Sequence, residues 1–178
     1  MPMNDDLADA LNAQITHEFN ASYIYLGIAA YFESLDLDGF AGWMRAQSTE
    51  EWDHGMRIFN HLAARDVPIT LSALLKPKTG YESTQAAVAA ALAYEQGNTR
   101  AVNALYGRSV ECGDYQAKSL MDWFVNEQIE EEDTLRTLLS QLKIAGGDGA
   151  GLLILDRELG ARQGASPEAG DMEGDSAL

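Results

Sequence analysis

Residues 48–55 have the sequence STEEWDHG, which places a carboxylate and an imidazole three residues apart, at Glu51 and His54. Both positions continue a row of apolar side chains at three- and four-residue steps that includes Met44 and Ile58. This spacing is typical of the buried face of an α-helix, so both polar side chains are expected to point into the protein core. Carboxylate and imidazole together are a ligand set for iron, manganese or zinc. A metal site here requires further ligands from other parts of the chain.

Five segments of the chain are predicted to be helices. Only four prolines occur in the 178 residues, so helix breakers are rare. Four of the segments are long, and a helix of roughly 30 residues extends about 45 Å at 1.5 Å per residue. Helices of that length need partners, which a four-helix bundle supplies. The predicted helices cover about 4–34, 38–65, 83–113, 114–143 and, after a glycine-rich turn, 152–162.

The connections between these helices predict the topology of the bundle. The first and third junctions are only a few residues long, so the helices that they join are expected to be antiparallel. The middle connection, 67–81, contains two prolines and a glycine and has no clear periodicity. It is long enough to run the length of a bundle and leave the second and third helices parallel. We therefore predict an all-α fold, a ferritin-like four-helix bundle with one long crossover and a short fifth helix.

Steps of three and four residues along each long helix predict an inward row. On the first helix this row runs from Leu7 to Phe32, and on the third it passes through Glu95, Thr99, Val102 and Tyr106. Each of the four rows carries a glutamate close to the midpoint of its helix. Antiparallel packing is expected to bring these four glutamates to one level of the bundle. If they were ionised and uncompensated there, they would cost many kcal/mol. A buried network of acids alone lacks hydrogen-bond donors, which favours neutralisation by a multivalent cation over a purely structural role. The four residues are Glu18, Glu51, Glu95 and Glu131.

The spacing of these ligands indicates two metal ions rather than one. Glu51 and His54 point the same way and can share the first ion, which Glu18 completes. Glu51 can also bridge to a second ion that Glu95 and Glu131 bind. Such sets of glutamates with a Glu-x-x-His motif occur in carboxylate-bridged di-iron bundles.

Four stretches of the chain resemble the bacterial non-haem ferritins, with a likeness that extends over about residues 4–162. They are ITHEFNASYIY (15–25), AQSTEEWDH (46–54), AYEQ (93–96) and WFVNEQIEEED (123–133). The resemblance implies that Glu18, Glu51 and His54 bind the first iron of a ferroxidase centre, and that Glu51, Glu95 and Glu131 bind the second. It further implies a third, weaker iron site at Glu50, Glu127 and Glu130, a tyrosine beside the centre at Tyr25, and a glutamine near the second iron at Gln128.

Purely structural roles are the alternative for the outer residues of this set. Glu50, Glu127 and Glu130 could be acids on a solvated face. Tyr25, which we expect to be a catalytic residue acting as a redox or hydrogen-bonding partner, could instead be a core aromatic whose hydroxyl contacts an acid. The chain also departs from the haem-binding relatives of the family. It lacks a second Glu-x-x-His motif on the fourth helix, and Trp52 stands where those relatives have a haem-ligating methionine. We therefore expect no haem.

The resemblance implies an iron-storage protein that oxidises Fe(II) with O₂ or H₂O₂. The family builds a homo-oligomeric shell of 24 subunits with octahedral symmetry, in which the apolar run at 152–155 would pack around four-fold axes. A rubrerythrin-like peroxidase or oxygenase is one alternative, but those proteins usually add a cysteine-rich domain, and this chain has one cysteine. A DNA-protecting mini-ferritin is another, although its tail is often basic. In a non-catalytic helical scaffold the buried acids would only destabilise the fold.

Composition limits the partners and the location of the protein. The formal charge is −16, from 28 acidic and 12 basic residues, which disfavours binding to nucleic acid or to an anionic membrane. The N-terminal residues show no signal-peptide pattern, and the lone Cys112 fits a reducing compartment such as the cytoplasm. We expect residues 1–162 to form one ferritin-like di-iron domain and residues 163–178 to be a disordered acidic tail.

Overall fold

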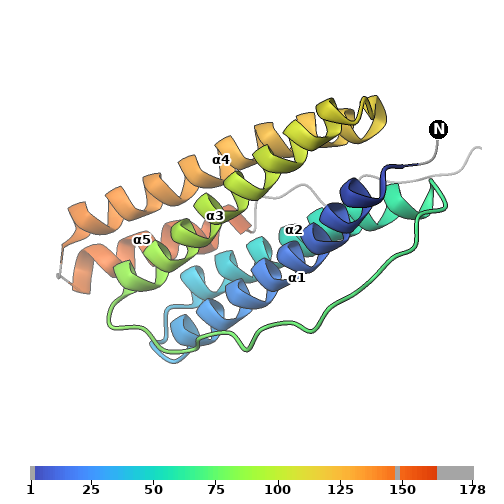
Figure 1. Cartoon of the computed structure of the whole chain (residues 1–178). Helices are drawn as coiled ribbons and strands as arrows, with labels where there is room; N and C mark the ends of the chain where they lie inside the picture. Colours follow the sequence, from blue (N-terminus) through green and yellow to red (C-terminus); the bar gives the residue numbers. More distant parts are fainter. Residues whose placement is uncertain (1–2, 147–148, 164–178) are drawn as a thin grey trace, which may run out of the picture.

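Five α-helices make up the fold of this chain (Figure 1). The structure, a computed structural model, describes residues 3–146 and 149–163. The predicted all-α class, the long crossover and the short fifth helix are confirmed, and α5 begins earlier than predicted. Of the tail predicted for 163–178, Gln163 is the last residue of α5, and residues 164–178 lie outside the described part of the chain. The helices are α1 (Asp5–Glu33), α2 (Asp38–Ala63), α3 (Thr84–Glu111), α4 (Tyr115–Ala145) and α5 (Gly149–Gln163).

The crossover between α2 and α3 runs in extended form along the length of the bundle, beside α1 (Figure 1). Side chains of α1 bind its backbone. Asn12 donates from its amide nitrogen to the carbonyl of Pro68 (3.0 Å) and accepts from the backbone N–H of Thr70 (2.7 Å). Two turns further along, Asn20 accepts from the N–H of Leu75 (2.8 Å). These contacts hold a segment that has no secondary structure of its own against the bundle.

Three of the helices begin at residues whose side chains accept hydrogen bonds from the first turn. Asn4, Ser83 and Asp114 do so for α1, α3 and α4, at distances of 3.0–3.2 Å. Helix α2 has no such cap, because its N-cap position is Leu37. Its first turn is instead bound by a residue of α5, since Oδ1 of Asp156 accepts from the N–H of Phe40 (2.9 Å).

Helices α2 and α5 approach each other closely at Gly39. A Cβ atom at Gly39 would lie 1.8 Å from the carbonyl oxygen of Asp156. We expect Gly39→Ala to displace α5 and to lower the free energy of unfolding by about 1–3 kcal/mol, measured by urea denaturation. Gly107→Ala on α3 is the matched control, because nothing lies within 4 Å of its Cβ position. Alanine there should stabilise by up to about 1 kcal/mol, and equal effects at both positions would contradict the close approach.

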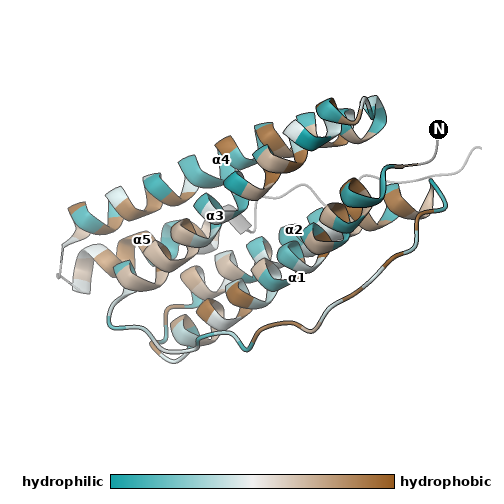
Figure 2. Ribbon diagram, in the orientation of Figure 1, coloured by the Kyte–Doolittle hydropathy of each residue, from teal (hydrophilic) through white to brown (hydrophobic). Residues whose placement is uncertain are grey.

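The apolar core is divided into two clusters, one toward each end of the bundle. One contains Phe32, Phe40 and Leu138 and includes residues of α5, and the other contains Leu11, Ile58 and Phe124. Polar and apolar residues alternate along each ribbon in Figure 2, as expected for helices with one buried face. A level of buried polar residues lies between the two clusters. None of the described helices is both long enough and apolar enough to cross a bilayer.

The predicted inward rows are confirmed on α1 and need correction on α3. Every residue of the α1 row, from Leu7 to Phe32, is buried. On α3 the prediction placed Thr99 and Tyr106 inward, but both are half-buried, while the neighbouring Asn98 and Leu105 are buried. The inward face of α3 is thus rotated by about one residue at these two turns.

Candidate metal centre

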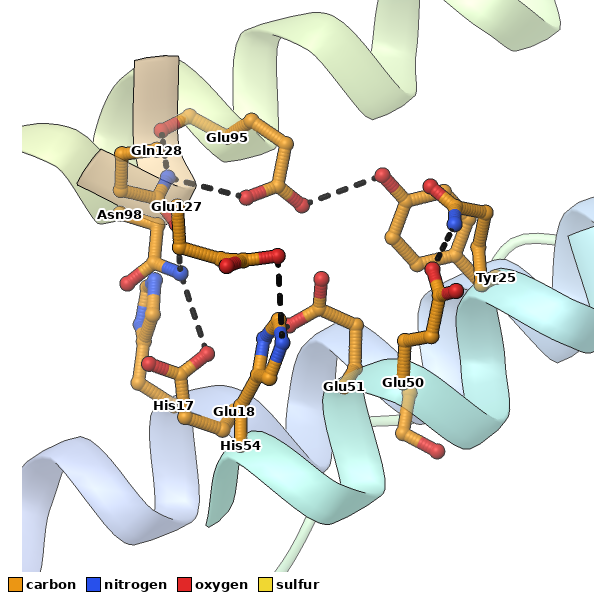
Figure 3. Close-up of polar contacts among 12 residues, drawn as sticks. His17, Glu18, Tyr25, Glu50, Glu51, His54, Glu95, Asn98, Glu127 and Gln128 are labelled. Carbon is orange, nitrogen blue, oxygen red and sulfur yellow. Dashed lines mark hydrogen bonds and ion pairs between the residues drawn. The ribbon is translucent and has the colours of Figure 1, made fainter. Parts of the chain in front are cut away.

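Four glutamates, one from each long helix, are buried at the level between the two apolar clusters. Their exposed fractions are 0% for Glu18, 1% for Glu51, 0% for Glu95 and 6% for Glu131. Figure 3 shows Glu18, Glu51 and Glu95 turned toward a common space between the helices. The structure therefore brings together the four acids whose convergence was predicted from the sequence.

His54 lies between two groups of carboxylates. Its Nδ1 atom is 3.4 Å from Oε2 of Glu51, and its Nε2 atom is 3.9 Å from Oε1 of Glu127. Ligand atoms of Glu18, Glu51 and His54 all lie within 4.8 Å of one another, and the same holds for His54, Glu127 and Glu131. One imidazole is thus in reach of two possible cation positions.

Burial makes the charged forms of these side chains unfavourable. It raises the pKa of Glu18 to about 7 and that of Glu131 to about 8, with further increases from neighbouring carboxylates such as Glu95. The pKa of Glu51 is raised well above its usual range, again chiefly by burial. Burial, and then the charge of Arg57, lowers the pKa of His54 to about 4. A neutral imidazole can bind a metal ion, and a cation among the carboxylates would oppose their pKa increases.

One carboxylate oxygen in this group has no hydrogen-bond partner. Oε2 of Glu51 is fully buried and accepts from no donor among the described residues. A buried unpaired oxygen costs about 1–3 kcal/mol, more when it is charged. Oxygen and imidazole donors of this kind suit iron, manganese or zinc, and the unpaired oxygen marks where a cation would be bound.

The three outer acids lie between this centre and the surface. Glu50 and Glu130 are exposed, and Glu127 is half-buried and faces His54. Burial and then repulsion from Glu127 and Asp53 raise the pKa of Glu50. The pKa of Glu127 is raised by burial and by repulsion from Glu130. The structure therefore groups these acids at the edge of the buried centre.

Tyr25 and Gln128 both contact Glu95. The hydroxyl of Tyr25 donates to Oε1 of Glu95 (3.2 Å), and Nε2 of Gln128 donates to Oε2 (3.2 Å; Figure 3). Burial and the charges of Glu95, Glu51 and Glu131 raise the pKa of Tyr25 well above its usual range. Tyr25 therefore remains protonated and keeps its hydrogen bond to Glu95 across the physiological pH range.

Asn98 is a buried residue at this level that the sequence analysis did not identify. Its amide nitrogen donates to Oε2 of Glu18 (3.0 Å), and its side chain is fully buried. The signal that could have identified it is its position three residues after Glu95, on the same face of α3.

Aromatic side chains pack around the centre. The guanidinium of Arg57 lies 3.8 Å from the centroid of the Trp123 ring, which makes a T-shaped contact with the ring of His54. Trp52 is half exposed and stacks on Phe19 (4.4 Å between centroids). His17 is half-buried and stacks on Tyr94.

Comparison with known proteins agrees with this geometry. Residues 8–145 match the ferritin-like domain. The bacterial non-heme ferritin of Staphylococcus aureus strain USA300 is 33% identical over 160 residues, which cover 90% of this chain and 96% of that protein. The bacterial non-heme ferritin of Staphylococcus haemolyticus is 34% identical, again over 90% of this chain and 96% of that protein.

Solved structures show the same architecture. The open pore ferritin of the hyperthermophilic archaeon Archaeoglobus fulgidus superposes with a TM-score of 0.89 at 34% identity, over 90% of this chain and 99% of that one. A humanized archaeal ferritin gives a TM-score of 0.89 at 35% identity over the same shares. The fold and the sequence both agree with those of these relatives, and this chain belongs to the ferritin family.

Proposed function

We propose that this chain is an iron-storage ferritin whose buried centre oxidises Fe(II). Two Fe(II) ions each lose one electron, and O₂ takes up both electrons with two protons to give H₂O₂. The observation that carries this proposal is the convergence of four buried glutamates and His54, with one oxygen of Glu51 left unpaired. Iron is the substrate of the centre and, as Fe(III), the stored material.

The ligand assignments are part of this proposal. Glu18, Glu51 and His54 would bind the first iron, which their mutual proximity supports. Glu51, Glu95 and Glu131 would bind the second, so Glu51 is shared. Tyr25 would hold Glu95 in place beside the second iron, as would Gln128. A third, weaker iron would be bound by Glu50, Glu127 and Glu130.

Storage requires a closed shell built from copies of this chain, and we propose 24 copies with octahedral symmetry. Large apolar side chains at the α4–α5 end support contacts between copies. Ile144 is 84% exposed, Ile154 59% and Leu153 50%, which is unfavourable for an isolated chain. Residues 1–162 form the shell-building domain in this proposal.

Location and haem are further parts of the proposal. The one cysteine, Cys112, is free and exposed, which fits the reducing cytoplasm. The proposal includes no haem, because Trp52 stands where the haem-binding relatives have a haem-ligating methionine, and its ring packs on Phe19.

The test is an anaerobic Fe(II) titration of the metal-free protein, followed by a pulse of air. Near-ultraviolet absorbance should rise quickly and saturate at about two Fe(III) per chain, as expected for a two-metal centre. Further additions in air should continue to be taken up into a particle that light scattering shows to be a large shell. Slow oxidation that does not saturate at about two Fe(III) per chain would contradict the proposed di-iron centre. A particle too small to be a closed shell would contradict the proposed storage of iron. Faster oxidation by H₂O₂ than by O₂ would identify peroxide as the oxidant.

A further inference from the structure

Asn98 is at the centre of a hydrogen-bonded group of amides behind the buried acids. Its Nδ2 atom donates to Oε2 of Glu18 (3.0 Å) and to Oε1 of Gln128 (3.3 Å). Its Oδ1 atom accepts from Nε2 of Gln14 (2.6 Å). Both N–H groups and the carbonyl are therefore paired within the core, at a residue with no exposed surface. The proposed function gives a role to Gln128 but none to Asn98 or Gln14.

The group links the carboxylates assigned to the two different irons. At one end, Nε2 of Gln14 also donates to Oε1 of Glu18 (2.8 Å), so both oxygens of Glu18 accept from amides. At the other end, Gln128 donates to Oε2 of Glu95 (3.2 Å), while Tyr25 donates to Oε1. The amides donate in one direction, from Gln14 through Asn98 and Gln128 to Glu95. Hydrogen bonds in such a series polarise and strengthen one another.

The donors in this group are neutral, which matters for a site that must attract cations. A lysine or arginine in the same place would orient the carboxylates but would also cancel the charge that binds a metal ion. Amides fix the orientation of Glu18 and Glu95 and leave that charge in place. Glu51 differs from both, because its Oε2 accepts no hydrogen bond from the described residues. The shared ligand is thus less restrained than the two that flank it.

We propose that Asn98 is a positioning residue that, with Gln14 and Gln128, holds Glu18 and Glu95 in their metal-binding orientations and couples the two metal positions. The inference rests on the proposed di-iron centre. It attributes the orientation of the metal-binding carboxylates to the amide side chains of Asn98, Gln14 and Gln128. Hydrogen bonds that orient metal ligands typically change metal affinity by about 10–100-fold when they are lost. Because Asn98 contacts Glu18 directly and Glu95 through Gln128, its loss should weaken both metal positions.

The test is an anaerobic Co(II) titration followed by the visible ligand-field spectrum. The wild-type chain should bind two Co(II). Asn98→Leu, which removes all three hydrogen bonds at similar volume, should weaken both binding steps by about 10–100-fold and shift the bands. Gln14→Leu should weaken mainly the step that involves Glu18. Asn98→Ser, which is too short to reach both neighbours, gives the same test if the leucine variant does not fold.

Val102→Ala is the matched control, because Val102 lies one turn further along α3 in the apolar cluster. It should lower stability while leaving Co(II) affinity and spectrum unchanged. A folded Asn98→Leu or Asn98→Ser variant with wild-type affinity and spectrum would overturn the positioning role and leave the proposed function intact. A wild-type chain that fails to bind two Co(II) would instead overturn the proposed function.

Discussion

Glu51→Gln will abolish rapid Fe(II) oxidation and will make the metal-free protein more stable above neutral pH. Glu51 is the ligand shared by the two proposed iron positions, so its loss disables both of them. We expect the initial rate to fall by more than about 100-fold, beyond the 10–100-fold typical when only an outer hydrogen bond is lost. Glutamine keeps the shape of the side chain, so the effect is not one of a cavity.

The gain in stability has a separate cause. Glu51 is 1% exposed, and burial together with repulsion from Glu95, Glu18 and Glu131 raises its pKa well above the usual range. A neutral amide removes that repulsion in the absence of metal, which is the trade between stability and activity expected at a functional site.

Stopped-flow absorbance gives the rate of oxidation by Glu51→Gln, and urea denaturation at pH 8 gives its stability. Asp9→Asn, on the exposed side of α1, is the control and should change neither quantity. An unchanged oxidation rate in Glu51→Gln would show that Glu51 is not the shared ligand. If the metal-free variant is less stable than the wild type, repulsion between Glu51 and its neighbouring carboxylates does not explain the stability of the metal-free protein.

The metal-free protein will also lose stability as the pH rises from about 6.5 to 8. Burial raises the pKa of Glu18 from 4.5 to about 7 and that of Glu131 to about 8, so the folded chain retains protons that the unfolded chain releases. Their stabilising contribution is complete below about pH 4.5 and is lost as the pH rises through 7 and 8. The fall expected from these two groups between pH 6.5 and 8 is about 2 kcal/mol.

His54 acts in the opposite direction but at lower pH. Its pKa is lowered from 6.5 to about 4, so its contribution is complete above about pH 6.5 and is lost as the pH falls toward 4. Above pH 6.5 the carboxyl groups therefore determine the trend. A divalent metal should reverse it, because metal binding requires deprotonated ligands and strengthens as the pH rises.

Urea denaturation at several pH values, with and without Co(II), measures both trends. Glu131→Gln should reduce the slope of the metal-free protein. If the free energy of unfolding of the metal-free wild type stays constant or rises between pH 6.5 and 8, the raised pKa values of the buried carboxyl groups are contradicted. If the stability of the metal-bound protein also falls over this range, metal binding by these carboxylates is contradicted.

The sequence predicted the level of the acids better than the contacts between them. Helix lengths and short junctions were enough to place Glu18 and Glu131 at the same level of the bundle. The face of α3 was less well predicted, since the alanine-rich segment before Glu95 offers few large apolar side chains to mark its orientation. The spacing of Asn98 from Glu95 indicates a buried side chain, but its role depends on partners from α1 and α4, which spacing within α3 does not reveal.

The residue that caps the first turn of α2 could likewise not be predicted from the sequence. The residue that binds its first turn, Asp156, lies 116 positions away from Phe40 in the chain. Local capping signals work only when the acceptor immediately precedes the helix, as at Asn4 and Ser83.

The pairing of the helices has a consequence for the lifetime of the folded chain. The most extensive helix contacts are those of α1 with α2 and of α3 with α4, and each pair provides two of the four buried glutamates. The proposed second ion, bound by Glu51 of α2, Glu95 of α3 and Glu131 of α4, therefore joins two hairpins whose only covalent connection among the described helices is the long crossover. Such a contact can form only after the hairpins have docked, so it slows their separation and leaves the rate of docking almost unchanged. Iron would thus lengthen the lifetime of the folded subunit without hastening its assembly.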